Sequence, residues 1–315
     1  MKKLKIYVFA SDYNEIHYLK LQIKSFKKNF FRNNEEFIVV NGSTTNKGDV
    51  EKLCKENNVE CIEYDDRLSI YNSHPHLNKC FGFYKFLTNE IQKSNDYIMS
   101  LHTDMFFLKH LDYEDLFSKK CFWFIPRYHD NLFYVWEGVF LIDCEKFNQK
   151  GYGEFFNMSG FAPNGDGCSI SHYSLEKMDK NDFGYLEFWN LGDTDGIKYD
   201  THLSGHMRYS FDINERIVKN YYDGSGLRMG NKTYNYEDVI ENYNEYYINN
   251  FVRIKEKYVD NFDFPKPLNF DVISVYGDQL NEFLIHFKSG SGYQPYFNEN
   301  YKVAKINCLN KIIES

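Results

Sequence analysis

Two side chains that can bind a metal ion lie one residue apart in the tripeptide His102-Thr103-Asp104. They directly follow the short apolar run Tyr97–Leu101, which is typical of a buried strand. In an open α/β sheet, ligands bind at the carboxyl ends of the strands, where a carboxylate such as Asp104 could hold a hard cation beside a diphosphate. A local turn built on the Asp side chain explains the tripeptide equally well, so the rest of the chain has to decide.

Polar residues also follow other predicted strands of the amino-terminal part. The strand at residues 5–10 ends in Ser11-Asp12-Tyr13, and the strand at residues 59–64 ends in Asp65-Asp66-Arg67. Because the carboxyl ends of parallel strands meet at one edge of a sheet, these residues are expected to line one pocket. Asp65 or Asp66 could accept hydrogen bonds from ribose hydroxyls or from a base, and Tyr13 could stack on the base. The residues predicted to contact a nucleotide are Ala10, Ser11, Asp12, Tyr13, Asp65, Asp66 and Arg67.

A further candidate lies late in the sequence. Residues 283–287 form an apolar, strand-like run that contains His286, and Lys288 follows as the chain enters the small-residue stretch 289–292. The backbone N–H groups of Gly290 and Ser291 could bind a phosphate oxygen. Taken alone, the segment is also compatible with a surface hairpin that carries an incidental histidine.

The tripeptide His102-Thr103-Asp104 resembles the Asp-x-Asp motif of GT-A fold glycosyltransferases, with histidine at the first acidic position. The segment from His286 to Ser291 resembles the His-x-x-Gly-x-x-Lys element of glycogenin-like GT-A enzymes, although its Lys288 precedes the glycine. The resemblance implies that His102, Asp104 and His286 bind a metal ion and that Lys288 contacts the diphosphate. Since histidine is a softer ligand than a carboxylate, Mn²⁺ is favoured over Mg²⁺.

The same resemblance implies a nucleotide-sugar donor, UDP-linked, and a glycan or another hydroxyl-bearing acceptor. In such enzymes a carboxylate faces the acceptor hydroxyl, and Asp200, Asp166 and Glu137 all compete for this role without a ranking from the sequence. Glu137 lies between Trp136 and Gly138, and Trp136 could either stack on a sugar face or belong to the core.

The elements that would position these residues alternate between strands and helices. Strands are predicted at residues 5–10, 36–40, 59–64 and 97–101, and helices at residues 18–30, 50–57 and 76–93. The alternation predicts an α/β, GT-A-like fold with a mostly parallel sheet flanked by helices. No GxGxxG pattern follows the first strand, which disfavours a dinucleotide site.

The second part of the sequence is less regular. Strands are predicted at residues 121–125 and 134–143, a loop-dominated stretch at 151–196 and a helical insert at about 231–260. We predict a single catalytic domain over residues 1–315, with a nucleotide-sugar-binding half at 1–110 and an acceptor-side half at 111–315.

Composition restricts the class of protein further. The formal net charge is −8 and the basic residues are scattered, which disfavours binding to nucleic acid or to an anionic membrane. Seven cysteines without CxxC spacing are typical of free thiols in a reducing compartment. The sequence has no signal-peptide core and no apolar run long enough to span a membrane, so a soluble, cytoplasmic protein is predicted.

Two other functions fit parts of the sequence. A sugar-nucleotide nucleotidyltransferase would need a glycine-rich basic loop after the first strand, and Ser11-Asp12-Tyr13-Asn14 is no such loop. A non-catalytic carbohydrate-binding protein would use the many aromatic residues, 19% of the chain, only to stack on sugars.

Overall fold

The computed structural model describes residues 2–11, 16–64, 75–129, 132–154, 156, 160–161, 168–169, 175, 177–190, 228–229, 232–233, 253–262, 270–275, 281–287 and 299–315. Ten strands form a single sheet, in the order β3 (Glu60–Glu63), β2 (Glu35–Asn41), β1 (Leu4–Ala10), β4 (Tyr97–Leu101), β7 (Leu132–Asp143), β6 (Phe122–His129), β10 (Phe183–Asn190), β13 (Phe270–Val275), β14 (Asn281–Phe287) and β5 (Met105–Phe107). Two two-stranded sheets pair β8 (Gly160–Phe161) with β9 (Cys168–Ser169) and β11 (Arg228–Met229) with β12 (Lys232–Thr233).

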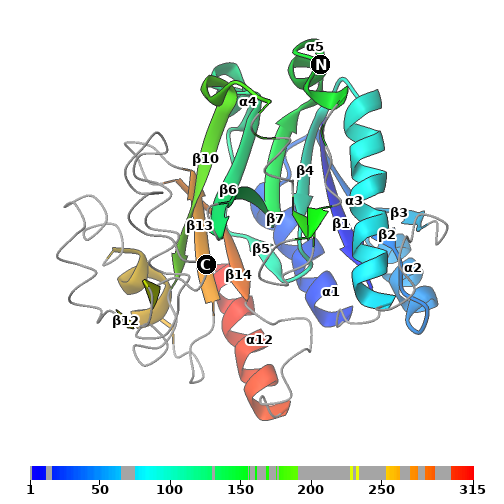
Figure 1. Ribbon diagram of the computed structural model, residues 1–315. Coiled ribbons are helices and arrows are strands. Elements are labelled where there is room, and N and C mark those ends of the chain that lie inside the picture. Colours follow the sequence, from blue (N-terminus) through cyan, green and yellow to red (C-terminus); the bar gives the residue numbers. More distant parts are fainter. Residues whose placement is uncertain are drawn as a thin grey trace.

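Helices cover both faces of the large sheet (Figure 1). On one face, α1 (Ile16–Ser25), its π-helical continuation η1 (Phe26–Phe30), α2 (Lys47–Glu56) and α4 (Tyr113–Lys119) contribute to one apolar cluster. On the other face, α3 (Pro75–Lys93) and α5 (Cys144–Gln149) build a second cluster. The helix α12 (Glu299–Glu314) packs with β13, β14 and β5 in a third. The remaining short helices are η3 (Tyr152–Glu154), η4 (Lys180–Asp182) and η5 (Glu256–Asp260).

Burial on both faces explains why the central strands β1 and β4 are mainly apolar. In β1, Ile6 and Val8 face the α1 side, whereas Tyr7 and Phe9 face the α3 side. Successive side chains of a strand point to opposite faces, so a strand covered twice needs apolar residues at every position. The run at residues 5–10 could therefore be recognised as a strand from its composition.

The α/β sheet flanked by helices is confirmed, and its directions are mixed. β3, β2, β1 and β4 are parallel neighbours, and β6 and β10 form the remaining parallel pair. The other pairs, β4–β7, β7–β6, β10–β13, β13–β14 and β14–β5, are antiparallel. Only two residues separate β6 from β7, and a connection that short can join strands only in the antiparallel sense. The parallel arrangement is thus concentrated in the part where strands and helices alternate.

Two predictions for the second part of the chain need correction. The stretch 151–196 contains the eight-residue strand β10 in the middle of the large sheet, not only loops. The predicted helical insert begins instead with strand β12, which pairs with β11. In the sequence the dipeptide Gly230-Asn231 lies between these two strands, and such a dipeptide is typical of a hairpin loop. Within the described part of the insert, helical backbone is found at η5.

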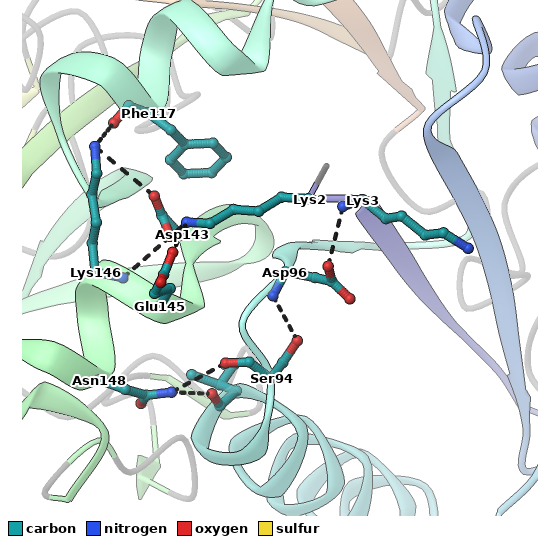
Figure 2. A network of polar contacts seen from close by, with 10 residues as sticks. Lys2, Lys3, Ser94, Asp96, Phe117, Asp143, Glu145, Lys146 and Asn148 are labelled. Carbon is teal, nitrogen blue, oxygen red and sulfur yellow. Dashed lines mark hydrogen bonds and ion pairs between the residues drawn. The ribbon is translucent and has the colours of Figure 1, made fainter.

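Ion pairs and hydrogen bonds connect distant parts of the sequence near the amino ends of β1 and β4 (Figure 2). The ammonium group of Lys2 lies 2.7 Å from the buried Asp143, which caps α5, and 2.8 Å from Glu145. Asp96, just before β4, accepts a hydrogen bond from the Lys3 backbone and lies 2.9 Å from the Lys5 ammonium. These contacts lie at the edge of the sheet where the parallel strands begin, away from the edge where these strands end.

Five cysteines are free thiols among the side chains that the structure describes: Cys54, Cys61, Cys121, Cys144 and Cys308. None of the described helices has both the length and the apolar character of a membrane span.

A buried carboxylate near the start of β14 gives a testable pH dependence. Glu282 is 4% exposed, and its side chain lies 2.6 Å from Lys257 and 3.6 Å from Lys109. Burial alone would raise the pKa of Glu282, but the hydrogen bond from Lys257 and the nearby positive charges hold it below its usual range. A carboxylate with a lowered folded-state pKa stabilises the fold above its unfolded-state pKa, and this contribution disappears as the pH falls through the folded-state pKa.

We therefore expect Glu282→Gln to lower the free energy of unfolding by about 1–3 kcal/mol at neutral pH. The difference from the wild type should shrink as the pH is lowered below about 4, where the wild-type carboxylate also becomes neutral. Urea unfolding of both proteins across this pH range measures the difference. A difference that stays constant with pH would show that the charge of Glu282 does not contribute.

Candidate active site

The turn His102–Asp104 lies where β4 ends and is held from two sides. The backbone N–H of His102 donates to the carbonyl of Gly138 in β7 at 3.0 Å. The carbonyl of His102 accepts from the side-chain amide of Gln22 in α1 at 2.6 Å. Gln22 is completely buried, whereas His102 is half-buried. The predicted motif therefore has a backbone conformation fixed by a strand and a helix.

The strand β5 follows the turn immediately but pairs at the far end of the sheet. It lies antiparallel to β14, with Met105 opposite His286 and Ile285 opposite Phe106. The backbone N–H of Phe287 donates to the carbonyl of Asp104 at 2.9 Å. This pairing places two residues from distant parts of the sequence, Asp104 and His286, next to each other.

Asp104 and His286 form a buried ion pair. Their closest atoms, Oδ1 of Asp104 and Nε2 of His286, are 3.6 Å apart, and the two side chains are only 11% and 9% exposed. This distance is too long for a hydrogen bond and corresponds to a charge–charge contact. The prediction that these two residues converge thus agrees with their observed positions.

The other nitrogen of His286 contacts a second carboxylate, Asp271 of β13. His286 and Asp271 are opposite each other in the β13–β14 ladder, and Nδ1 of His286 lies 3.0 Å from Oδ2 of Asp271. Asp271 is completely buried. The imidazole ring is therefore held between two carboxylates, one at each nitrogen.

The pKa values of this group reflect the balance between burial and charge. Burial by itself would raise the pKa of Asp104, but the positive charge of His286 and, to a smaller extent, His102 holds it below its usual range. Burial by itself would lower the pKa of His286, but the carboxylates of Asp104 and Asp271 raise it above its usual value. Electrostatics at this position therefore favours a positive charge between the two acids.

His102 lies nearby but takes part in other contacts. Its Nε2 is 3.4 Å from the hydroxyl of Tyr84 in α3, and its ring packs edge to face on Trp136, with ring centroids 5.9 Å apart. Trp136 makes a similar contact with His286 at 5.3 Å. Trp136 is 5% exposed, so it belongs to the core beside the site and does not offer an exposed ring face on which a sugar could stack.

Within the described part of the chain, no group of three or more His, Cys, Asp or Glu side chains is arranged to hold a metal ion. Asp104 and His286 nevertheless fit a metal that completes its coordination elsewhere. Oδ1 of Asp104 is buried and accepts no hydrogen bond in the described structure, although a buried acceptor usually has a partner. Divalent ions such as Mg²⁺ are commonly held by one or two protein side chains together with phosphate oxygens of a substrate. A histidine backed by a carboxylate is also a common arrangement in metal ligands.

Of the predicted nucleotide-binding residues, Ala10 and Ser11 lie at the carboxyl end of β1 and are buried. β1 runs parallel to β4, with Val8 opposite Leu101, so both strands end at the same edge of the sheet. The hydroxyl of Ser11 makes no hydrogen bond within the described residues. Outside the described residues lie Asp12, Tyr13, Asp65, Asp66, Arg67, Asp166, Asp200, Lys288, Gly290 and Ser291, together with the side chain of Glu137.

Three residues that contact His102 or His286 were not predicted from the sequence: Asp271, Gln22 and Tyr84. Asp271 had a recognisable signal, because it is the single acid in the otherwise apolar and small run 270–275. A charge at a fully buried strand position has to be compensated, so such a residue indicates a specific partner. Gln22 interrupts a series of apolar residues at helical spacing, and Tyr84 extends one. Neither residue has a signal in the sequence comparable to that of Asp271.

A substitution at Gly138 tests how closely Trp136 is packed. A Cβ atom at Gly138 would lie 2.4 Å from the Trp136 ring, whereas a Cβ at Gly48 in α2 would meet no atom within 4 Å. We expect Gly138→Ala to lower the free energy of unfolding by about 1–3 kcal/mol, because the indole has to shift in a close-packed core. Gly48→Ala is the matched control and should be neutral or stabilising by up to about 1 kcal/mol. Urea unfolding measures both; equal stabilities would contradict the packing described here.

No protein-family model and no curated protein matches the sequence. Solved structures with a similar fold include mouse xyloside xylosyltransferase 1, which is 11% identical, with 59% of this chain and 85% of that chain covered and a TM-score of 0.38. The galactosyltransferase LgtC, in complex with donor and acceptor sugar analogues, is 13% identical, with 58% and 73% covered and a TM-score of 0.37. The glycosyltransferase GlyE of Streptococcus pneumoniae TIGR4 is 12% identical, with 67% and 48% covered and a TM-score of 0.35.

The sheet itself is a mixed α/β sheet with helices on both faces (Figure 1), in agreement with the α/β class that the sequence predicts. The chemistry has to be inferred from the side chains of this chain.

Proposed function

We propose that this chain is a metal-dependent glycosyltransferase that transfers a hexosyl group from a nucleotide sugar, UDP-linked, to a hydroxyl of a glycan. The observation that supports the proposal most directly is the buried pair of Asp104 and His286 at the end of β4. It combines a carboxylate whose Oδ1 accepts no hydrogen bond in the described structure with an imidazole that is backed by a second acid.

In this proposal Asp104 and His286 hold Mn²⁺ or Mg²⁺, and phosphate oxygens of the donor complete the coordination. When bound, such a cation acts as a Lewis acid that neutralises the charge of the departing nucleoside diphosphate. The protein supplies a fixed, buried position for the ion, because the backbone hydrogen bond from Phe287 to Asp104 joins β14 to the turn that precedes β5. Preorganised groups of this kind stabilise developing charge without further rearrangement.

The remaining predicted residues take their roles in the same proposal. Ser11 lies at the adjacent end of β1 with a hydroxyl that can bind the nucleotide. Lys288, which directly follows β14, would add a positive charge beside the diphosphate. Asp200, Asp166 and Glu137 stay as alternatives for the carboxylate that faces the acceptor.

A thermal-shift panel of nucleotide sugars with and without Mn²⁺ tests the function. A ligand that binds only the folded state stabilises it by about 2.7 kcal/mol at a hundredfold excess over its dissociation constant. We expect the largest shift with a UDP-sugar and Mn²⁺ together and a small one with either alone. Stabilisation by a nucleoside triphosphate with a sugar phosphate would instead indicate a nucleotidyltransferase. Stabilisation by a free glycan without metal would indicate a binding protein.

A further inference from the structure

A buried acid lies behind His286, on the side of the ring away from Asp104. Asp271 contacts Nδ1 of His286 at 3.0 Å, whereas Asp104 faces Nε2 at 3.6 Å. The two nitrogens point in different directions from one rigid ring. The ring would therefore have to rotate before Nδ1 could face Asp104 and Nε2 could face Asp271.

The sheet restricts that rotation. His286 belongs to β14, which has β13 on one side and β5 on the other, so its backbone is fixed by two ladders. Asp271 is its direct cross-strand neighbour on β13, and Trp136 packs edge to face against the ring. Asp271 is 0% exposed and His286 is 7% exposed, so water does not compete for the contact.

The chemistry of the contact determines which nitrogen faces the site. A carboxylate can only accept, so Asp271 requires a proton on Nδ1 of His286. When the ring gives up its Nε2 proton to bind a metal ion, the lone pair lies on Nε2, which faces Asp104. A hydrogen bond to one ring nitrogen thus decides which nitrogen is available for a metal ion.

From this geometry we propose that Asp271 is a positioning residue, which fixes the His286 ring with Nε2 toward Asp104 before any ligand enters. Its use in binding a cation rests on the function proposed above, whereas the ring orientation itself does not. An alternative role for Asp271 is purely structural, as half of a buried ion pair that joins β13 to β14. The two roles differ in what the Asp271 variants do to metal affinity and to the Nδ1 proton.

The first measurement uses the metal-free protein. An imidazole N–H proton that exchanges slowly with water is expected in the proton NMR spectrum, and His286→Gln identifies it by its loss. We expect Asp271→Ala to lose this resonance and Glu282→Gln to keep it. Glu282 is a matched control because it is a buried carboxylate of the same hairpin whose described ion pairs involve Lys257, Lys109 and Arg253.

The second measurement is the affinity for Mn²⁺ by isothermal titration calorimetry. Loss of a carboxylate that orients a ligating histidine typically weakens metal binding by about 10–100-fold. We expect a loss in this range for Asp271→Asn, a larger one for Asp271→Ala and no change for Glu282→Gln. Asp271→Asn keeps the shape of the side chain, so it tests the inference even where the alanine variant folds poorly.

Wild-type Mn²⁺ affinity in both Asp271 variants, or persistence of the N–H resonance in Asp271→Ala, would overturn the inference. Absence of Mn²⁺ binding in the wild type, with the resonance behaving as expected, would overturn the proposed metal dependence and leave the role of Asp271 in ring orientation supported.

Discussion

Asp104→Asn should abolish metal-dependent nucleotide-sugar binding while the chain stays folded. Asp104 supplies a formal negative charge on the Nε2 side of His286, and an amide is a much weaker ligand for a hard cation. We expect Mn²⁺ affinity and transfer rate each to fall by about a hundredfold or more, comparable to the loss of one electrostatic stabiliser in an active site. Calorimetry with Mn²⁺ and the rate of nucleoside diphosphate release measure the two effects.

Asp96 provides the matched control, because it precedes the same strand that Asp104 follows. Its carboxylate lies 2.9 Å from Lys5 at the opposite edge of the sheet. Asp96→Asn removes a charge from β4 without approaching the site, so we expect stability to change slightly and Mn²⁺ affinity not at all. Equal losses of affinity in both variants would mean that Asp104 acts through the stability of β4 and not as a ligand.

His286→Ala should be the most destabilising single change in the site. It removes the positive charge that lies between Asp104 and Asp271, and breaking a buried pair by deleting one partner costs about 3–5 kcal/mol. We expect a loss of this size in the free energy of unfolding, measured by urea denaturation near neutral pH. The deleted ring also leaves Trp136 without one of its edge-to-face contacts.

The double variant Asp104→Asn with His286→Ala separates charge from packing. If unpaired carboxylates cause the loss, neutralising one of them should make the double variant more stable than His286→Ala alone. If the cavity left by the ring causes the loss, the double variant should be no more stable. A cost for His286→Ala below about 1 kcal/mol would contradict the buried ion pair altogether, since typical surface changes already reach about 0.5 kcal/mol.

The parts of the fold that the sequence predicts are those in which local patterns and tertiary burial agree. β1 and β4 are mainly apolar because helices cover both faces, and α1 and α3 have apolar residues at helical spacing. The pair of Asp104 and His286 could be predicted for a similar reason, because Asp104 directly precedes the apolar strand β5 and His286 is the penultimate residue of the apolar strand β14. In these places short-range sequence information is sufficient.

Other parts depend on long-range pairing that leaves no local mark. β5 has three residues, and nothing in Met105-Phe106-Phe107 indicates that it pairs with β14 and not with a neighbour of β4. β10 was hidden within a stretch rich in glycine and polar residues. β13 was not predicted, although the turn dipeptide Gly277-Asp278 follows it in the sequence. The partner of Asp271 is determined by its register with His286 across β13 and β14, and the spacing of residues in the sequence does not reveal this register.

The placement of β5 beside β14 has a consequence for how the protein matures. Asp104 emerges early during synthesis, whereas β13 and β14 are made only after most of the chain. Contacts between residues so far apart in sequence form late, because a long loop has to close first. A nascent chain that already contains β1 to β4 therefore lacks His286 and Asp271, and it has an unpaired carboxylate where the finished protein has an ion pair. If Asp104 and His286 hold a cation as proposed, its binding would require that β13 and β14 have already joined the sheet.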